Sequence, residues 1–241
     1  MSGITITTLS SLHSSLHQLH TSQSVPYIAF SSIPLPLTLV STLDLPPPPS
    51  SYTHLLPDTH PPWYDAVGLG ADDDEVLVCF ASTWNNGEMD TWAFGLPTIR
   101  GYFSGVGDLF SAMVLAHFDN PDSKSDLPAL PHAVSKALLT VQQVLLRTHL
   151  YSLSQAGPSG SAAPRPLHHA NTPINNGDHL QSVIPSDTEL DTIEPLDPKN
   201  PKRKAKRMRV RELRLVQERA LIADGGEGWP GRRMNWSSIL K

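Results

Sequence analysis

The sequence predicts an α/β domain that is interrupted by two low-complexity segments. Apolar residues recur at helical spacing in some stretches and form continuous, strand-like runs in others. The 23 prolines are unevenly spread, and their clusters indicate where regular structure stops. With 241 residues, the chain is long enough to bury a sizeable core as one domain, with or without tails.

A helix and a strand are expected first. Residues 4–20 carry four leucines at helical spacing, namely Leu9, Leu12, Leu16 and Leu19. Ser10 or Ser11 is available to cap this helix. Residues 25–30 then predict a short buried strand that ends at Ser31 and Ser32. From residue 35 to residue 74, clustered prolines predict irregular chain.

A β-hairpin is expected next. Residues 75–82 form a continuous apolar run, which is typical of a strand buried on both faces. Residues 90–99 are its expected antiparallel neighbour, because Asn86-Gly87 is a turn signal. Cys79, the one cysteine, lies in the first of these strands and is expected to be a buried small hydrophobic residue. A single cysteine excludes an internal disulfide.

Two helices, a disordered insertion and a short C-terminal segment are expected in the rest of the chain. Helices are expected at residues 108–117 and 133–153, the second with an apolar stripe at Val134, Leu138, Val141, Leu145 and Thr148. Residues 155–200 are rich in Pro, Ser, Asn and Asp and predict a disordered insertion. Residues 212–217 predict a final packed segment, followed by a polar tail that contains Gly225, Gly226 and Gly228.

Charge and hydropathy limit the classes of partner. A net charge of −5 and a pI of about 6.1 argue against a general attraction to nucleic acid or membranes, so neither partner is expected. The N-terminus lacks a signal-peptide pattern, and prolines interrupt the most apolar stretch, residues 25–40. We therefore expect a cytoplasmic protein. A nuclear location is the alternative, because seven of the ten side chains in residues 202–211 are basic; a solvated end of the insertion is the favoured interpretation of that run.

The histidines are the candidate metal ligands. His13, His17 and His20 share a helical face, and His168 and His169 form a second group. No cysteine or acidic residue accompanies them at a matching spacing. We therefore expect structural or solvated roles for these histidines and no metal site.

The turn at Gly105-Val106-Gly107-Asp108 is the strongest candidate for chemistry. Two glycines allow consecutive N–H groups to point at one spot, and a helix that begins there adds its unpaired N–H groups and its dipole. Such a site suits a phosphate oxygen, and Asp108 could accept a proton from a hydroxyl that attacks the phosphorus. Aspartate is also common in the first turn of helices for structural reasons alone, so the turn by itself leaves both roles open.

Four segments in the same order resemble pyridoxal kinases of the ribokinase-like superfamily. Residues 103–113 (FSGVGDLFSAM) resemble the Gly-X-Gly-Asp active-site segment, and residues 28–36 (IAFSSIPLP) resemble the strand whose hydroxyl residues meet the ATP phosphates. Residues 144–148 (VLLRT) and 211–217 (RELRLVQ) resemble the following helix and the C-terminal segment. The resemblance implies a three-layer α/β/α sheet that is incomplete, because Ser2-Gly3-Ile4 matches a point about half-way along the family.

The resemblance also implies an activity. It is the ATP-dependent phosphorylation of the 5′-hydroxymethyl group of pyridoxal, pyridoxine or pyridoxamine, with Mg²⁺ on the phosphates and a monovalent cation such as K⁺. Asp108 would be the base, and Val106 stands where the family often has Thr or Ala. The other implied residues are Gly105, Val106 and Gly107 for the anion hole, Ser31 and Ser32 for the nucleotide phosphates, and Ile99 and Phe110 near the nucleotide. Apolar residues at the last two positions serve equally well as core.

We expect three parts in the chain. Residues 1–154 would be the nucleotide-binding and catalytic half, with the irregular insertion at 36–74. Residues 155–208 would be the disordered insertion with its basic run, and residues 209–241 the C-terminal segment of the kinase domain and its tail. The full-length protein would be a homodimer. The alternative is a truncated, non-catalytic, kinase-like interaction protein.

Overall fold

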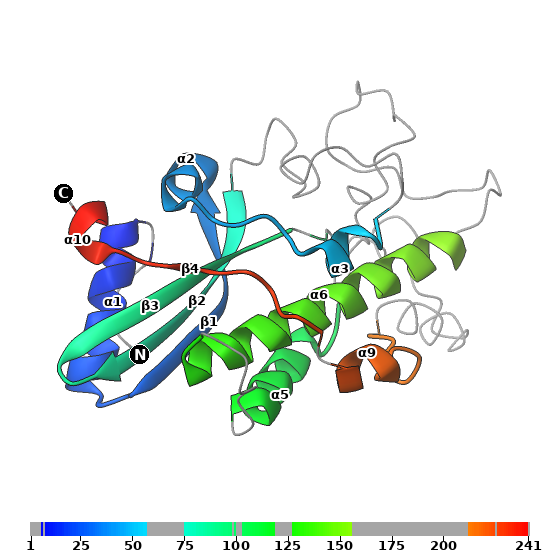
Figure 1. The fold of residues 1–241 in the computed structure, drawn as a ribbon. Coiled ribbons are helices and arrows are strands. Elements are labelled where there is room, and N and C mark those ends of the chain that lie inside the picture. The colour runs from blue at the N-terminus through cyan, green and yellow to red at the C-terminus, as the bar shows by residue number, and fades with distance from the viewer. Residues whose placement is uncertain are drawn as a thin grey trace, which may run out of the picture.

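A four-stranded antiparallel sheet, in the order β1-β2-β3-β4, forms the centre of the molecule (Figure 1). The computed structural model describes residues 6, 8–56, 75–97, 99, 103–118, 127–155, 212–224 and 226–240. The strands are β1 (Tyr27–Pro36), β2 (Glu75–Asn85), β3 (Glu88–Leu96) and β4 (Arg232–Arg233). The helices are α1 (Leu9–Ser22), α2 (Leu37–Val40), the 3₁₀ turn η1 (Ser41–Leu43), α3 (Ser50–Thr53), α5 (Val106–Phe118), α6 (Ala129–Gln155), α9 (Arg219–Asp224) and α10 (Trp236–Ile239).

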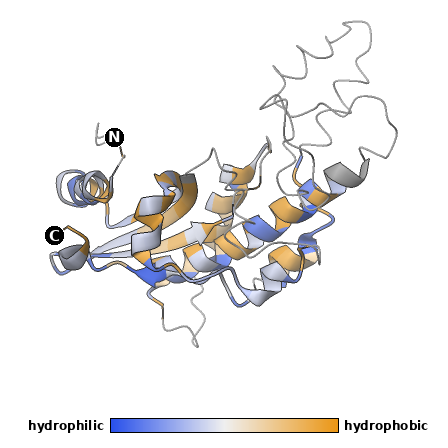
Figure 2. Ribbon diagram, turned by 90° about the horizontal axis from the view of Figure 1, so that it is seen from above, coloured by the Kyte–Doolittle hydropathy of each residue, from blue (hydrophilic) through white to orange (hydrophobic). Residues whose placement is uncertain are grey.

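Helices cover both faces of this sheet, as the predicted α/β class requires. Along β2, Cys79 and Ala81 belong to the core cluster that contains α5 and α6. Val78 and Phe80 alternate with them and belong to a second cluster, with α1 and α2. Figure 2 shows hydrophobic residues along both the strands and α6. β2 is therefore buried on both faces, and the predicted α/β architecture is confirmed.

The predicted hairpin is present, with a tight turn. Asn86 and Gly87 both have positive φ, at 52° and 85°, and Asn85 pairs with Glu88 across the turn. Two consecutive residues with positive φ are what a two-residue type I′ hairpin requires. β3 ends at Leu96, three residues before the predicted end.

β1 is longer than predicted. It runs through Ser31 and Ser32 to Pro36, with an irregularity in register between Phe30 and Ile33. An edge strand tolerates proline, because a missing N–H on its outer side removes no hydrogen bond of the sheet. The expectation of irregular chain from residue 35 onward is also wrong in part, since α2, η1 and α3 form short helical turns there.

The predicted first helix is confirmed as α1, but its cap is different. Thr8 is the N-cap: its Oγ1 accepts a hydrogen bond from the N–H of Ser11 at 3.1 Å. The Oγ of Ser11 accepts a hydrogen bond from the N–H of Thr8 at 3.0 Å. This reciprocal pair is a capping box, in which Ser11 is the partner of the cap.

The second predicted helix is confirmed as α6, which is buried on more than one side. The predicted stripe is buried, and so are Ala137, Leu139 and Leu146 outside it. α5 packs against this helix, and α9 contacts it as well. The predicted stripe therefore contains only part of the buried surface of α6, because neighbouring elements cover the helix on several sides.

The predicted polar tail is the largest error of the sequence analysis. Trp229 is 0% exposed and belongs to the core cluster with α6. Its indole Nε1 donates a hydrogen bond to the carbonyl of Gly95 at 2.8 Å, and its N–H donates to the carbonyl of Ser135 at 2.9 Å. Residues 226–235, which we call the C-terminal strap, run from α6 across β3 and are part of the fold (Figure 1).

Two predicted segments lie outside the described residues: most of the disordered insertion and the basic run, both within 156–211. The predicted packed segment at residues 212–217 is packed only in part. Leu213 packs against the core, whereas Leu215 and Val216 are 38% and 77% exposed. Among the described helices, none is long and apolar enough to cross a membrane.

His20 joins α1 to the sheet through a chain of buried hydrogen bonds. Its Nδ1 lies 2.6 Å from the carbonyl of Val25, which can only accept, so Nδ1 carries the proton. Its Nε2 then accepts from the hydroxyl of Ser82 at 2.8 Å. The hydroxyl of Thr91 donates in turn to Ser82 at 3.1 Å and accepts from the indole of Trp236 at 3.2 Å. This chain uses the neutral form of His20.

Lowering the pH from 7.5 to 5.5 is expected to destabilise the fold. Burial lowers the pKa of His20, as does the neighbouring His17, while the hydrogen bond to Val25 opposes them. The folded-state pKa lies below the ordinary value of 6.5, so the unfolded chain binds more protons. Stability is therefore full above about pH 6.5 and is lost as the pH falls through the folded-state pKa. Urea unfolding at the two pH values measures the difference.

His20→Gln is the matched variant for this test. It should be less stable than the wild type at pH 7.5, because the buried chain of hydrogen bonds is broken. Its stability should also change less between pH 7.5 and pH 5.5. An equal pH dependence in the two proteins would show that His20 is not responsible.

Candidate active site at the start of helix α5

Gly105 forms the turn that leads into α5. Its φ is +86°, in the left-handed region that favours glycine. Its carbonyl accepts a hydrogen bond from the N–H of Leu109 at 2.9 Å, so Gly105 is the N-cap of the helix. The N–H groups of Val106, Gly107 and Asp108 follow in the first turn, where an α-helix offers them no partner. Three donors therefore lie next to the positive end of the helix dipole.

Gly107 is not required by the fold as the structure describes it. It lies inside the helix, and a Cβ built on it would meet nothing within 4 Å. Alanine at this position would favour the helix by about 1 kcal/mol. No described residue would contact a Cβ at Gly105 or Gly107, and close approach of a ligand to the backbone is one reason for glycine at these positions.

Asp108 follows in the first turn with an exposed side chain. Within the described part of the chain, no residue forms a hydrogen bond or an ion pair with its carboxylate. Gly105, not Asp108, is the N-cap, but an acidic side chain in the first turn still favours the helix dipole. Both roles that the sequence left open for Asp108 therefore stay open, and its role as a base stays a prediction.

The turn is held in place on both sides. Ser104 forms a parallel bridge with Glu212, and the ring of Phe103 contacts the ring of His149 on α6 at 6.4 Å. After the turn, Phe110 is buried in the core cluster, and Ile99 packs against the same cluster. Both apolar residues therefore serve as core, which the sequence analysis kept open as the other role for them.

Ser31 and Ser32 lie on a different element from the turn. Both are exposed on β1, where the pairing with β2 is irregular. β1 meets α5 where the ring of Tyr27 contacts the ring of Phe118, at 5.0 Å. Phe118 is the last residue of α5, whereas Asp108 is in its first turn. A role for the two serines in phosphate binding stays a prediction.

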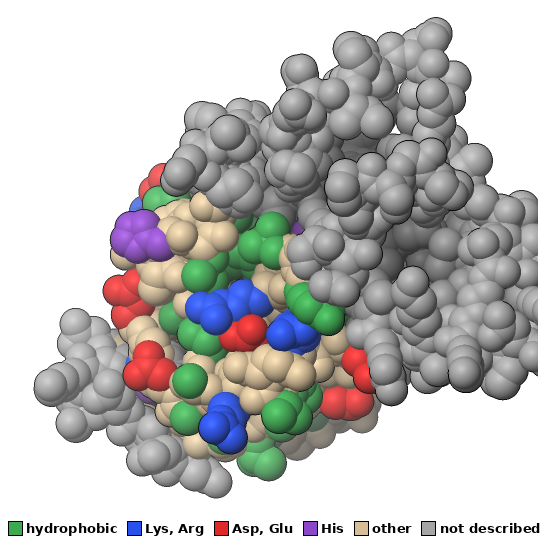
Figure 3. Space-filling view, turned by 90° about the vertical axis from the view of Figure 1, so that its right-hand side faces the viewer, with side chains coloured by type: hydrophobic (Ala, Val, Ile, Leu, Met, Phe, Trp, Pro, Cys, Tyr) green, Lys and Arg blue, Asp and Glu red, His purple; other side chains and the backbone are tan. Residues whose placement is uncertain are grey.

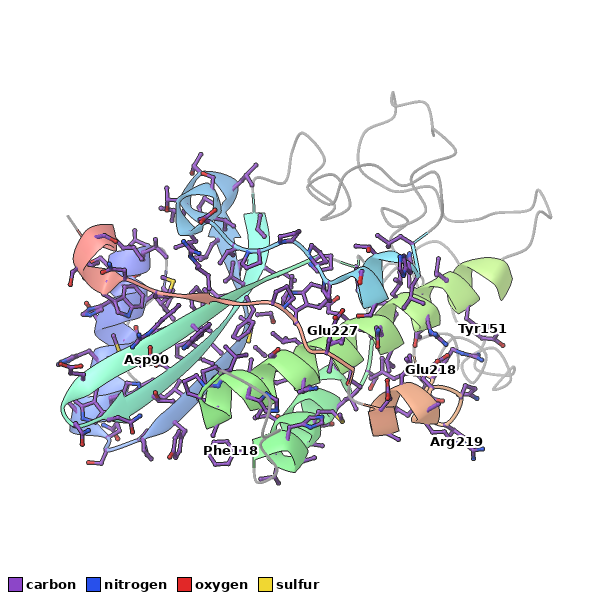
Figure 4. The ribbon with its side chains drawn as sticks, viewed as in Figure 1. Asp90, Phe118, Tyr151, Glu218, Arg219 and Glu227 are labelled. Atoms are coloured by element: carbon purple, nitrogen blue, oxygen red, sulfur yellow. The ribbon has the colours of Figure 1, made fainter. Side chains whose placement is uncertain are left out.

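Two arginines near the turn were not selected from the sequence. Arg147 forms an ion pair with Glu218 at 2.8 Å, and Arg214 lies over the ring of Tyr151 at 3.8 Å from its centroid. Arg214 follows Glu212, the bridge partner of Ser104, by two residues. Figure 4 shows Tyr151, Glu218 and Arg219 at the same end of the molecule, and Figure 3 shows basic and acidic side chains side by side on that face. Both arginines lie in segments that resemble the kinase family, 144–148 and 211–217, but only the tertiary structure shows what their side chains contact.

The solved structures that this chain is similar to include pyridoxal kinase from Leishmania donovani in complex with ADP. The complex with ADP and ginkgotoxin is 13% identical, with a TM-score of 0.48, over 97% of this chain and 47% of that chain. The complex with ADP and pyridoxine is 14% identical, with a TM-score of 0.48, over 97% of this chain and 47% of that chain.

The likeness is to pyridoxal kinase. At these identities the likeness concerns the fold, and the chain spans about half the length of the structures it matches. No protein-family model matches the sequence, and no curated protein does.

Proposed function

We propose that this chain is the nucleotide-binding and catalytic half of a pyridoxal kinase, an ATP-dependent phosphotransferase of vitamin B6 salvage. The substrates are pyridoxal, pyridoxine and pyridoxamine, which receive the phosphoryl group on the 5′-hydroxymethyl oxygen. The observation that carries the proposal is the turn at Gly105–Asp108, where a left-handed glycine, a helical glycine with no packing neighbour among the described residues and an exposed carboxylate come together. The four resembling segments supply the substrate class.

The turn would act by electrostatic stabilisation and by proton acceptance. The N–H groups of the first turn of α5 hold the transferring phosphoryl group, whose negative charge the helix dipole also favours. The carboxylate of Asp108 accepts the proton of the attacking hydroxyl as the new O–P bond forms. Ser31 and Ser32 contact the phosphates of the nucleotide in this proposal.

The residues at the turn are compatible with Mg²⁺ bound mainly through phosphates. Among the described residues, no group of three or more His, Cys, Asp or Glu side chains could hold a metal ion. Mg²⁺ commonly takes most of its ligands from substrate phosphates and water, so the turn needs no dedicated cluster of metal ligands. When bound, Mg²⁺ neutralises charge on the phosphates. The need for K⁺ and homodimer formation by the full-length protein are part of the same proposal.

The second candidate is a non-catalytic interaction protein on a partial kinase fold. The observation that favours it is the share of the matched structures that this chain covers, 47% to 48%. The two candidates differ in nucleotide binding, which only the first requires. The cytoplasmic location and the three-part division of the chain belong to the first candidate.

Gly107→Ala is expected to weaken the binding of ADP with Mg²⁺ by at least about tenfold, because the new methyl group occupies the space where phosphate oxygens approach the backbone. The same change should leave the fold as stable as before, or more stable by up to about 1 kcal/mol. Isothermal titration calorimetry gives the affinity, and urea unfolding gives the stability.

Ser111→Ala is the matched control, since Ser111 is exposed on the same helix one turn further on. It should change neither nucleotide affinity nor stability. A wild-type chain without measurable ADP affinity would favour the interaction protein. A Gly107→Ala chain that binds ADP as tightly as the wild type would contradict the phosphate-binding role of the turn.

A further inference from the structure

Two histidines stand next to each other on the outer side of α1. His13 and His17 are four residues apart, which places them one above the other on one face of the helix. Their ring centroids are 6.2 Å apart, and the two ring planes are inclined by 22°. Two imidazoles at this spacing can bind one metal ion together.

Each of the two rings is supported by a tryptophan from another element. The ring of His13 contacts Trp236 of α10 edge-on, at 5.0 Å and an interplanar angle of 69°. The ring of His17 contacts Trp84 of β2 edge-on, at 5.6 Å and 84°. Such contacts hold the two imidazoles side by side on the outer face of α1. Trp84 and Trp236 lie 71 and 223 positions after His13 in the sequence, so the sequence pattern could not reveal these contacts.

The outer edges of the two rings are open. A shallow surface depression of about 360 Å³ lies over them, lined by His13, Ser14, His17, Gln18, Thr21 and Ser22. All six residues belong to α1, which carries no Lys, Arg, Asp or Glu. The depression therefore has room for an ion with its water ligands, and no side chain of α1 carries a positive charge that would repel it.

We propose that His13 and His17 together bind one transition-metal ion of the Zn²⁺ type, each through one imidazole nitrogen, with water at the remaining positions. Imidazole suits Zn²⁺, Ni²⁺ and Cu²⁺ and is a poor ligand for Mg²⁺. The site lies with the core cluster of α1, across the sheet from the cluster that contains α5. It is thus separate from the phosphate-binding turn and from any Mg²⁺ there, and it does not rest on the proposed kinase function.

The test is a titration of the full chain with ZnCl₂ in competition with a chromophoric zinc indicator. The chain has 11 histidines, so the signal that counts is the difference between matched variants. His17→Gln removes one ligand at an exposed position, and His13→Gln removes the other. His54→Gln is the control, because His54 is exposed on a different element, at the end of α3.

We expect His17→Gln and His13→Gln each to lose one equivalent of Zn²⁺ that the wild type binds, or to bind it at least about tenfold more weakly. His54→Gln should retain it. Cu²⁺ should bind more tightly than Ni²⁺, and Mg²⁺ should not compete. Electron paramagnetic resonance of the Cu²⁺ form should show two nitrogen ligands at this equivalent.

Equal Zn²⁺ binding by the wild type and His17→Gln would overturn the proposal, and so would a Cu²⁺ spectrum that His17→Gln leaves unchanged. Far-UV circular dichroism of the variants checks that the helix is intact. Loss of Zn²⁺ by His54→Gln to the same extent would also overturn it, because the binding would then be unspecific.

Discussion

Replacing Trp229 with alanine is expected to lower the free energy of unfolding by about 3–5 kcal/mol, the range for removing a large aromatic side chain from a core. Trp229 is fully buried, and its ring meets the ring of Tyr52 edge-on at 5.1 Å. Its indole N–H satisfies the buried carbonyl of Gly95 at 2.8 Å. The substitution therefore removes packing and leaves a buried acceptor without its partner. Urea unfolding followed by far-UV circular dichroism measures the loss.

Two further variants separate the contributions to this loss. Trp229→Phe keeps an aromatic ring but removes the N–H, so it should destabilise the fold by about 1–3 kcal/mol. Trp84→Ala removes a tryptophan that is only half-buried, and it should be less harmful than Trp229→Ala. If Trp229→Ala unfolds at the same urea concentration as the wild type, the strap is not part of the core.

The hairpin and α1 show what local sequence determines. Asn86-Gly87 adopts positive φ at both positions, and a turn of this kind is specified by its own two residues. The leucines of α1 likewise form a buried face because their spacing matches the helical period. The cap was misassigned by only a few positions, since Thr8 and Ser11 are both residues that favour helix starts.

The strap and β1 show what local sequence cannot determine. Trp229 forms hydrogen bonds with Gly95 and Ser135, which lie 134 and 94 residues away along the chain. Four glycines and a proline within four residues of this tryptophan are typical of a tail, and nothing local indicates its partners. β1 continues past its serines because β2 pairs with it on both sides of the irregularity between Phe30 and Ile33, despite two prolines.

The candidate site divides in the same way. The glycine turn, the start of the helix and the position of Asp108 could be predicted, because a short motif specifies them. The lack of described neighbours around Gly107 could not be predicted, because it depends on how distant segments pack around the turn. The contacts of Arg147 and Arg214 also depend on segments that are distant in the sequence.

Asp108→Asn is expected to lower pyridoxal-dependent phosphoryl transfer by at least about 100-fold, the lower end of the range for a general base. Asparagine has nearly the same shape as aspartate, but its amide does not accept a proton from the attacking hydroxyl. The side chain is exposed and has no partner among the described residues, so the fold should keep its stability. The measurement is the formation of pyridoxal 5′-phosphate from ATP, Mg²⁺, K⁺ and pyridoxal, followed by chromatography.

Nucleotide affinity distinguishes a chemical defect from a binding defect in this variant. Asp108→Asn should bind ADP at least as tightly as the wild type, because a negative charge beside the phosphates has been removed. Ser111→Ala, on the same helix, should transfer phosphate at the wild-type rate. If the wild type binds ADP but forms no product, the turn binds phosphate without completing the reaction, and the non-catalytic alternative is favoured for this chain.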